Sequence, residues 1–186
     1  NTVIDALKMT LKKIDEDIAL SSKIIALLRD ELGFDLEKKN CILVTCHRRE
    51  NFGSGLEGIC LALKNISQRH PDLEIVFPVH FNPNVSSVVQ GKLKNIKNIH
   101  LIRPLQYEVF CFLMRAAKLI LTDSGGIQEE APSLGKPVLV MRDFTERVEA
   151  VNAGKVCLVG SSPHKIQAAV DKLVKRAFRF DMGVLS

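Results

Sequence analysis

The chain has 186 residues, of which 46% are hydrophobic and 25% charged, a composition typical of a globular α/β protein and unlike that of a disordered or collagen-like chain. The formal net charge of +5 is spread along the sequence, and the chain has nine Phe, one Tyr and no Trp. It therefore lacks the basic stripe with interleaved aromatic residues that is typical of a nucleic-acid binder, and we expect no nucleic-acid partner.

Neither a membrane segment nor a metal site is indicated by the sequence. No apolar run is long enough to cross a bilayer, and the first residues lack the basic and apolar regions of a signal peptide. The five cysteines form no C-x-x-C pair, and no cluster of residues has metal-ligand spacing. We expect a cytoplasmic protein with no membrane partner and no metal, whose cysteines are small, reduced and buried.

Two amphipathic helices are predicted at the start of the chain, over residues 3–14 and 18–32, and Gly33 is the expected stop of the second. From about residue 39 short apolar runs alternate with helical patterns. The predicted strands are 41–45, 73–77, 99–102, 119–122, 138–140 and 156–159. The predicted helices between and after them are 55–69, 85–93, 107–117, 126–134, 146–153 and 163–176.

This alternation predicts an α/β fold with a doubly wound, Rossmann-like parallel sheet, because the strands are nearly continuous in apolar residues and the connections are short. Such sheets bind ligands beyond the carboxyl ends of their strands. Polar side chains gather at those positions, after five of the predicted strands: they are residues 47–50, 80, 103, 123–126 and 142–143.

The segment 123–126, Asp-Ser-Gly-Gly, joins a predicted strand to a predicted helix. Ser124 is the expected N-cap, and Gly125 and Gly126 would let an anion approach the backbone N–H groups at the positive end of the helix dipole. Glu130, four residues after Gly126, would lie on the same face and accept hydrogen bonds from ribose hydroxyls. Glu129 has the same spacing to Gly125, and spacing alone leaves that choice open.

The segment 47–50, His-Arg-Arg-Glu, follows the first predicted strand. His47 can donate a proton or a hydrogen bond to a leaving phosphate, and the arginines can bind phosphate oxygens in bidentate geometry. A surface charge cluster is the alternative. Arg147 is a candidate phosphate ligand or a partner in a structural salt bridge, and His80 either lines a pocket or is a structural histidine.

Taken in series, the motifs of this chain resemble those of bacterial, non-hydrolysing UDP-N-acetylglucosamine 2-epimerases. The match begins at Asn1 and runs in consistent order to about residue 174. The matching motifs are VTCHRRENFG at 44–53, PVHFNPNV at 78–85, LTDSGGIQEEAP at 121–132, GKPVLVMR at 135–142 and TER at 145–147.

The resemblance implies the second, nucleotide-binding domain of a two-domain enzyme of the GT-B type. It divides the chain into a helical interdomain connection at 1–38, a UDP-binding domain at 39–177 and an unmatched tail at 178–186. The full enzyme would include an N-terminal domain that carries the proton-transfer carboxylates, and it would be a homodimer.

The resemblance also implies the site residues. Uracil would contact the backbone at Leu105 and Phe110, and ribose would contact Glu130. The diphosphate would lie against Ser124, Gly125, Gly126 and Arg147. His47 would be the catalytic residue beside it, and Arg48, Glu50 and His80 would belong to a regulatory second substrate site.

The implied reaction interconverts UDP-N-acetylglucosamine and UDP-N-acetylmannosamine by elimination and re-addition of UDP, with no cofactor. Val148 stands where the family usually has proline, which would loosen that loop. Three other readings stay open: half of a GT-B glycosyltransferase that uses a UDP-sugar, a hydrolysing epimerase, and a non-catalytic module that senses a nucleotide-sugar.

Overall fold

The computed structural model describes residues 2–147, 149, 151, 154 and 156–181, and contains a six-stranded parallel sheet with the order β3-β2-β1-β4-β5-β6. The strands are β1 (Asn40–Thr45), β2 (Leu73–Pro78), β3 (Ile99–Ile102), β4 (Leu119–Thr122), β5 (Val138–Val140) and β6 (Val156–Leu158). Each predicted strand is present, and no bound differs from its prediction by more than one residue. The predicted α/β fold with a parallel sheet is confirmed.

The helices also follow the predicted order, with differences of a few residues at their ends. They are α1 (Thr2–Glu16), α2 (Ile18–Leu32), α3 (Ser54–Arg69), α4 (Pro83–Leu93), α5 (Tyr107–Ala116), α6 (Ile127–Ser133) and α8 (Pro163–Asp181), with a short 3-10 turn η1 (Arg49–Asn51) after β1. Much of the helix predicted over 146–153 lies outside the described residues, as does Val148. The backbone of α8 continues into the predicted tail as far as Asp181.

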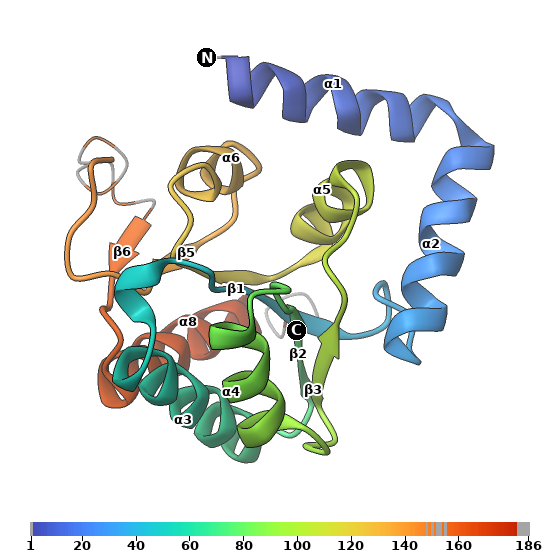
Figure 1. The fold of residues 1–186 in the computed structure, drawn as a ribbon. Helices are drawn as coiled ribbons and strands as arrows, with labels where there is room; N and C mark the ends of the chain where they lie inside the picture. The colour runs from blue at the N-terminus through green and yellow to red at the C-terminus, as the bar shows by residue number, and fades with distance from the viewer. Residues whose placement is uncertain (1, 148, 150, 152–153, 155, 182–186) are drawn as a thin grey trace.

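Helices cover both faces of the sheet (Figure 1). A separate apolar cluster is buried on each face. On one face α3, α4 and α8 pack over side chains such as Phe77, Ile42 and Leu121. On the other face α1, α2, α5 and α6 pack over side chains such as Leu43, Ile120 and Val140. Successive side chains of a strand point to opposite faces, so a strand covered on both sides is apolar along its whole length. The sheet is therefore doubly wound, as predicted.

The first two helices pack onto the same unit as the sheet. Leu7, Leu11 and Ile14 of α1 are buried in the cluster that contains α5 and α6. The side chain of Asp17 caps α2 by accepting a hydrogen bond from the Leu20 N–H at 2.9 Å. Gly33 ends the helix as predicted, with a φ of 74° that a residue without Cβ adopts freely. None of the described helices combines the length and the apolar character that a bilayer crossing requires.

All five cysteines, each within the described part of the chain, are free thiols, and only Cys157 is exposed. Burial raises the pKa of Cys41 to about 12 and that of Cys60 to about 11. The four buried thiols therefore stay protonated, as the sequence predicted, whereas the expectation of burial is wrong for Cys157.

The strand order reverses between β1 and β4, which are neighbours at the centre of the sheet. The chain leaves β1 toward β2 on one side and leaves β4 toward β5 on the other, so the connections after these strands diverge at the carboxyl edge of the sheet, where folds of this type form a ligand crevice. The segments that follow the two strands are 46–53 and 123–126. The two motifs that the sequence analysis singled out therefore meet at the position where doubly wound sheets bind ligands.

Candidate functional site

A fully buried carboxylate, that of Asp123, connects the two loops at the switch point. It accepts hydrogen bonds from the backbone N–H groups of His47 at 3.0 Å and Arg48 at 2.8 Å. It also accepts from the Nδ2 of Asn51 at 3.1 Å and the thiol of Cys46 at 3.2 Å. Burial and the neighbouring carboxylate raise the pKa of the Cys46 thiol above its usual range, so the thiol remains a donor. Asp123 thus fixes the backbone of the loop after β1.

His47 and His80, which come from different loops, lie side by side at this edge. Their rings stack with centroids 6.0 Å apart and an interplanar angle of 23°. The Nδ1 of His47 lies 3.3 Å from an oxygen of Asp123, and the His47 side chain is 41% exposed. The Nδ1 of His80 accepts a hydrogen bond from the Asn82 N–H at 3.1 Å. The structure therefore brings together the predicted catalytic histidine and one predicted regulatory residue.

Glu50, a second predicted regulatory residue, is held in an ion-pair network. The buried guanidinium of Arg142 donates from Nε to Glu50 at 2.6 Å and from Nη1 to Glu146 at 3.1 Å. Asn51 also donates to the Met141 carbonyl at 3.1 Å. The loop after β1 is consequently bound to the loop after β5 by charged and neutral hydrogen bonds.

The predicted N-cap role of Ser124 is wrong. Helix α6 begins at Ile127, and its N-cap is Gly126, whose φ of −63° and ψ of −44° are already helical. Ser124 stands two positions before the cap; its N–H donates to Thr122 Oγ1 at 2.9 Å, and its carbonyl accepts from Gln128 Nε2 at 3.2 Å. Because two glycines intervene between Ser124 and Ile127, the serine hydroxyl cannot take the capping position.

Two charged side chains flank the backbone of Gly125. A Cβ added at Gly125 would lie 3.0 Å from Glu146 Oε1 and 3.3 Å from Arg48 Nη2, whereas one at Gly126 would meet only Glu130 Oε2, at 3.8 Å. The glycine pair is therefore compatible with a ligand close to the backbone only where these flexible side chains leave room for it. Arg48 has an additional feature: its Nε is buried and has no hydrogen-bond partner.

Glu130 is buried, and one of its oxygens accepts a hydrogen bond from Tyr107 Oη at 3.0 Å. Burial raises the pKa of the Glu130 carboxyl, and the Tyr107 hydrogen bond partly opposes this. Leu105 and Phe110, predicted to contact uracil, are half-buried residues before and within α5 that pack against the α1–α5–α6 cluster. Tyr107 lies between them in the chain, so the predicted uracil and ribose contacts are neighbours.

Glu129 and Arg147 form an ion pair with each other, Nε to Oε1, at 2.5 Å. Sequence spacing did not decide which glutamate lies beside the glycine pair. In the structure Glu130 faces Gly126, whereas Glu129 pairs with Arg147. The Arg147 N–H also donates to Thr145 Oγ1 at 3.1 Å, and the Thr145 hydroxyl donates to Gln128 Oε1 at 2.6 Å. Of the two predicted roles of Arg147, phosphate ligand or salt-bridge partner, this structure shows the salt bridge.

Four residues that build this edge had no predicted role: Asp123 and Arg142 were expected only as polar residues at strand ends, and Tyr107 and Gln128 were not singled out. Asp123 directly follows an apolar strand, and a carboxylate at that position can point into the protein interior. Tyr107 is the only tyrosine in the chain, which by itself indicates no partner. The buried pair Gln128 and Arg142 bond to residues 17 and 92 positions away, and such contacts leave no local pattern.

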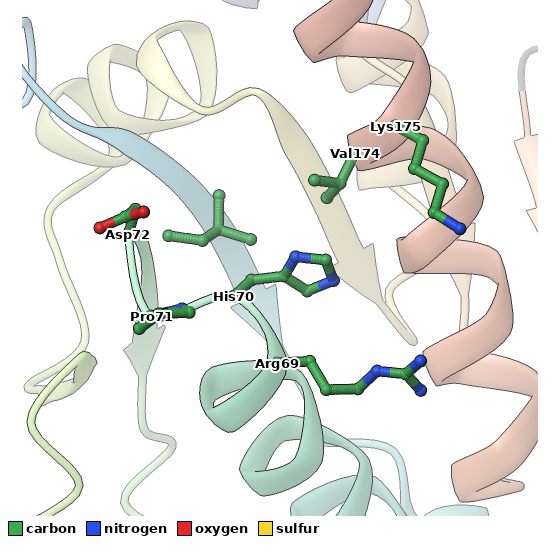
Figure 2. A pocket seen from close by; sticks show the side chains of 7 residues that line it. Arg69, His70, Pro71, Asp72, Val174 and Lys175 are labelled. Atoms are coloured by element: carbon green, nitrogen blue, oxygen red, sulfur yellow. The ribbon is translucent and has the colours of Figure 1, made fainter.

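A different pocket, of about 420 Å³, lies at the opposite edge of the sheet, where α3 ends, β2 begins and α8 passes. Figure 2 shows Arg69 and His70 directed toward the part of α8 that carries Val174 and Lys175. Both Arg69 and His70 pair with Asp171, at 3.3 and 2.7 Å. This pocket lies away from the residues that the sequence analysis selected. Within the described residues, no group of three or more His, Cys, Asp or Glu side chains is arranged to hold a metal ion.

Comparison with known proteins gives consistent matches. The sequence model described as UDP-N-acetylglucosamine 2-epimerase matches residues 1–182. A probable UDP-N-acetylglucosamine 2-epimerase of Ralstonia solanacearum is 56% identical over 171 residues, which are 92% of this chain and 44% of that protein. The UDP-N-acetylglucosamine 2-epimerase of Escherichia coli K12 is 53% identical over 175 residues, 94% of this chain and 46% of that protein.

Solved structures agree with the sequence matches. The Neisseria meningitidis UDP-GlcNAc 2-epimerase bound to UDP-GlcNAc superposes with a TM-score of 0.88 at 44% identity, over 94% of this chain and 46% of that one. The S. aureus MnaA–UDP complex superposes with a TM-score of 0.80 at 41% identity, over 94% and 44%. The chain spans about half the length of the curated relatives it matches. The family resemblance of the sequence is therefore confirmed: this chain belongs to the UDP-N-acetylglucosamine 2-epimerase family.

Proposed function

We propose that this chain is the UDP-binding half of a non-hydrolysing UDP-N-acetylglucosamine 2-epimerase. Support comes from the family membership and from the relatives whose solved structures contain UDP or UDP-GlcNAc. The observation that carries the proposal is the switch point, where His47 and Arg48, whose buried Nε has no partner, meet the glycine pair that follows β4. An unsatisfied guanidinium N–H beside bare backbone is suited to a phosphate oxygen.

In the proposed complex UDP extends along this edge from α5 to the loop after β1. The uracil lies against the backbone at Leu105 and Phe110, and the ribose hydroxyls bind Glu130 in place of Tyr107. The diphosphate lies at Ser124, Gly125 and Gly126. Arg147 joins it by exchanging its Glu129 partner for phosphate, which an ion pair with a partly exposed arginine permits at small cost.

The proposed reaction is elimination of UDP from C1 and C2 of the sugar, followed by re-addition of UDP at C1 with a proton delivered to the opposite face of C2. This chain supplies stabilisation of the leaving diphosphate, through backbone N–H groups and the His47 imidazole. The base that removes the C2 proton belongs to an N-terminal domain, which faces this one across a cleft in a GT-B arrangement. No cofactor takes part, and we propose a homodimer for the full-length enzyme.

The regulatory role of Arg48, Glu50 and His80 is part of the same proposal. Glu50 already pairs with Arg142, so a second substrate molecule would bind to a loop whose position depends on that pair. Arg48 is close enough to Gly125 to contact either a diphosphate or a neighbouring ligand.

Isothermal titration of the 186-residue chain with UDP tests the proposal. We expect one weak site per chain, and we expect His47→Gln to weaken it modestly while Glu130→Gln weakens it strongly. Absence of heat and of ligand-induced chemical-shift change at millimolar UDP would refute it. Product analysis on the full-length protein separates the alternatives: UDP-ManNAc indicates the non-hydrolysing epimerase, free ManNAc the hydrolysing one, and glycosyl transfer the transferase. Tight binding by the chain alone would indicate a sensor.

A further inference from the structure

The contact between the His47 ring and the buried carboxylate of Asp123 has a consequence for the histidine's protonation. Asp123 has no exposed surface, whereas the His47 side chain is 41% exposed. The Nδ1 of the ring lies 3.3 Å from Asp123 Oδ1. Its Nε2 is separated from Nδ1 by the ring carbon Cε1. One nitrogen of the imidazole therefore faces a buried carboxylate, and the other does not take part in this contact.

The position of the carboxylate does not depend on the histidine ring. It accepts from the His47 N–H, the Arg48 N–H, Asn51 Nδ2 and Cys46 Sγ at distances between 2.8 and 3.2 Å. All of these groups are donors, so the carboxylate presents acceptor oxygens to its surroundings and is held in one orientation. The ring approaches a fixed negative charge.

We propose that Asp123 is a positioning residue that holds neutral His47 as the Nδ1–H tautomer and so makes Nε2 the atom that exchanges a proton with the leaving diphosphate. A proton on Nδ1 is attracted to the carboxylate at this distance, whereas a lone pair on Nδ1 would be repelled by it. The role of Nε2 rests on the proposed function, because it requires a diphosphate beside His47. The tautomer itself requires only the contact between the two side chains.

The proton transfer balances within the proposed elimination. As the bond between C1 and the phosphate oxygen breaks, its electron pair stays on the oxygen of the UDP leaving group. The imidazolium form of His47 gives its Nε2 proton to the diphosphate, and the C2 proton passes to a base outside this chain. His47 is left neutral, with its remaining proton on Nδ1 against Asp123. When UDP adds back at C1, the Nε2 of His47 takes the proton back from the diphosphate, while C2 receives its proton on the opposite face from a group outside this chain.

His80 provides an internal control in the same stack of rings. Its Nδ1 accepts a hydrogen bond from the Asn82 N–H at 3.1 Å, so its proton must be on Nε2 when the ring is neutral. The two rings, 6.0 Å apart, are therefore expected in opposite tautomers. Solution conditions such as pH act on both histidines, so they would not give the two rings opposite tautomers.

Long-range ¹H–¹⁵N correlation NMR on the ¹⁵N-labelled 186-residue chain tests the inference at about pH 9, where histidine side chains are generally neutral. His47→Gln and His80→Gln identify the two sets of signals. We expect a pyrrole-type shift for Nδ1 and a pyridine-type shift for Nε2 in His47, and the reverse in His80. A pyrrole-type Nε2 or an even tautomer mixture in His47, with His80 as expected, would overturn the proposal.

The variant Asp123→Asn adds a second measurement. It keeps an oxygen for the backbone donors but removes the charge, so His47 should move toward the Nε2–H tautomer or a mixture. In the full-length enzyme kcat should fall about 10²- to 10⁴-fold with KM little changed. If this variant does not fold, the tautomer of His47 measured in the wild-type chain still tests the role of Asp123. UDP titration of the same sample separates the two proposals: a lack of any response to UDP counts against the proposed function, and a wrong tautomer counts against the role of Asp123.

Discussion

At the scale of single residues, Glu130 meets two opposing requirements. Burial raises the pKa of its carboxyl above the ordinary 4.5, so the ionised form costs the folded state free energy once the pH exceeds that value. Ligand binding, as proposed, needs the charge. We predict that Glu130→Gln is more stable than the wild type at pH 7. This advantage should vanish near pH 3, where Glu130 is protonated in both the folded and the unfolded wild type. UDP affinity of the variant should fall about 10- to 100-fold. Thermal unfolding at both pH values and titration calorimetry measure the three effects.

Glu129→Gln is the matched control, because Glu129 is the adjacent residue of α6 and pairs with Arg147. It should gain no comparable stability at pH 7, and it should not lower UDP affinity, since it releases Arg147. A loss of affinity as large as that of Glu130→Gln would indicate that the net charge of the helix, rather than the ribose contact, is what matters.

Gly125 offers a test that separates folding from ligand binding. A methyl group there would lie 3.0 Å from Glu146 Oε1 and 3.3 Å from Arg48 Nη2, both at the ends of flexible side chains. Gly125→Ala should therefore change the free energy of unfolding by less than about 1 kcal/mol, yet weaken UDP binding at least tenfold by occupying the proposed diphosphate position.

The control for this glycine is Gly91→Ala in α4, where an added Cβ would meet nothing within 4 Å. It should stabilise the chain by about 0.5–1 kcal/mol through helix propensity and leave UDP affinity unchanged. Unaltered UDP affinity in Gly125→Ala would argue against a diphosphate at this glycine.

At the residue scale, the sequence predicted which segments carry the chemistry but not how their side chains are connected. His47 and Glu130 were selected because they follow apolar strands or share a helix face with a glycine. Asp123 was passed over as a site residue, because its partners Cys46 and Arg48 are 77 and 75 positions away and are revealed only when β1 and β4 pair. The Ser124 cap failed because a serine before two glycines is compatible with either a cap or a turn.

At the scale of elements, the close packing of α3 depends on a glycine. A Cβ at Gly58 would lie 2.5 Å from the backbone carbonyl of Ser161, which precedes α8, and backbone atoms cannot move aside as a side-chain end can. Gly58→Ala should destabilise the chain by about 1–3 kcal/mol as measured by urea unfolding. Gly55→Ala on the same helix would make only ordinary contacts at 3.6 Å and should be neutral. Equal effects of the two substitutions would contradict the close approach at Ser161.

Elements were the most predictable level of this molecule. The period of apolar residues is a local property, so the strands were located to within one residue and the cap of α2 at Gly33 was correct. Helix ends were less exact: α1 extends to Glu16, because exposed polar positions do not reveal where a helical backbone stops, and the backbone of α8 extends to Asp181. The division into segments 1–38, 39–177 and 178–186 stays a prediction.

At the scale of the whole molecule, the parallel sheet brings residues that follow different strands together at one edge. Six parallel strands with short connections admit few topologies, and in the one found the loops after β1 and β4 flank the reversal of strand order. The sequence therefore indicated the edge at which we propose that the ligand binds. Which carboxylate meets which cation at that edge depends on tertiary packing, as the Arg142 pairs with Glu50 and Glu146 illustrate.

The whole chain should bind UDP without performing the reaction. Five carboxylates at this edge already have partners: they are Glu50, Asp123, Glu129, Glu130 and Glu146. A base for the C2 proton needs a carboxylate free to approach the sugar, and the proposal assigns it to the other domain. UDP at about 100 times its Kd should stabilise the chain by about 2.7 kcal/mol, which raises the unfolding temperature by several degrees. Under the same conditions NMR of UDP-GlcNAc incubated with the chain should detect no UDP-ManNAc. Epimerisation at a rate near that of a full-length relative would mean that the base lies within this chain, and substitution of Glu50 and Glu146 would then locate it.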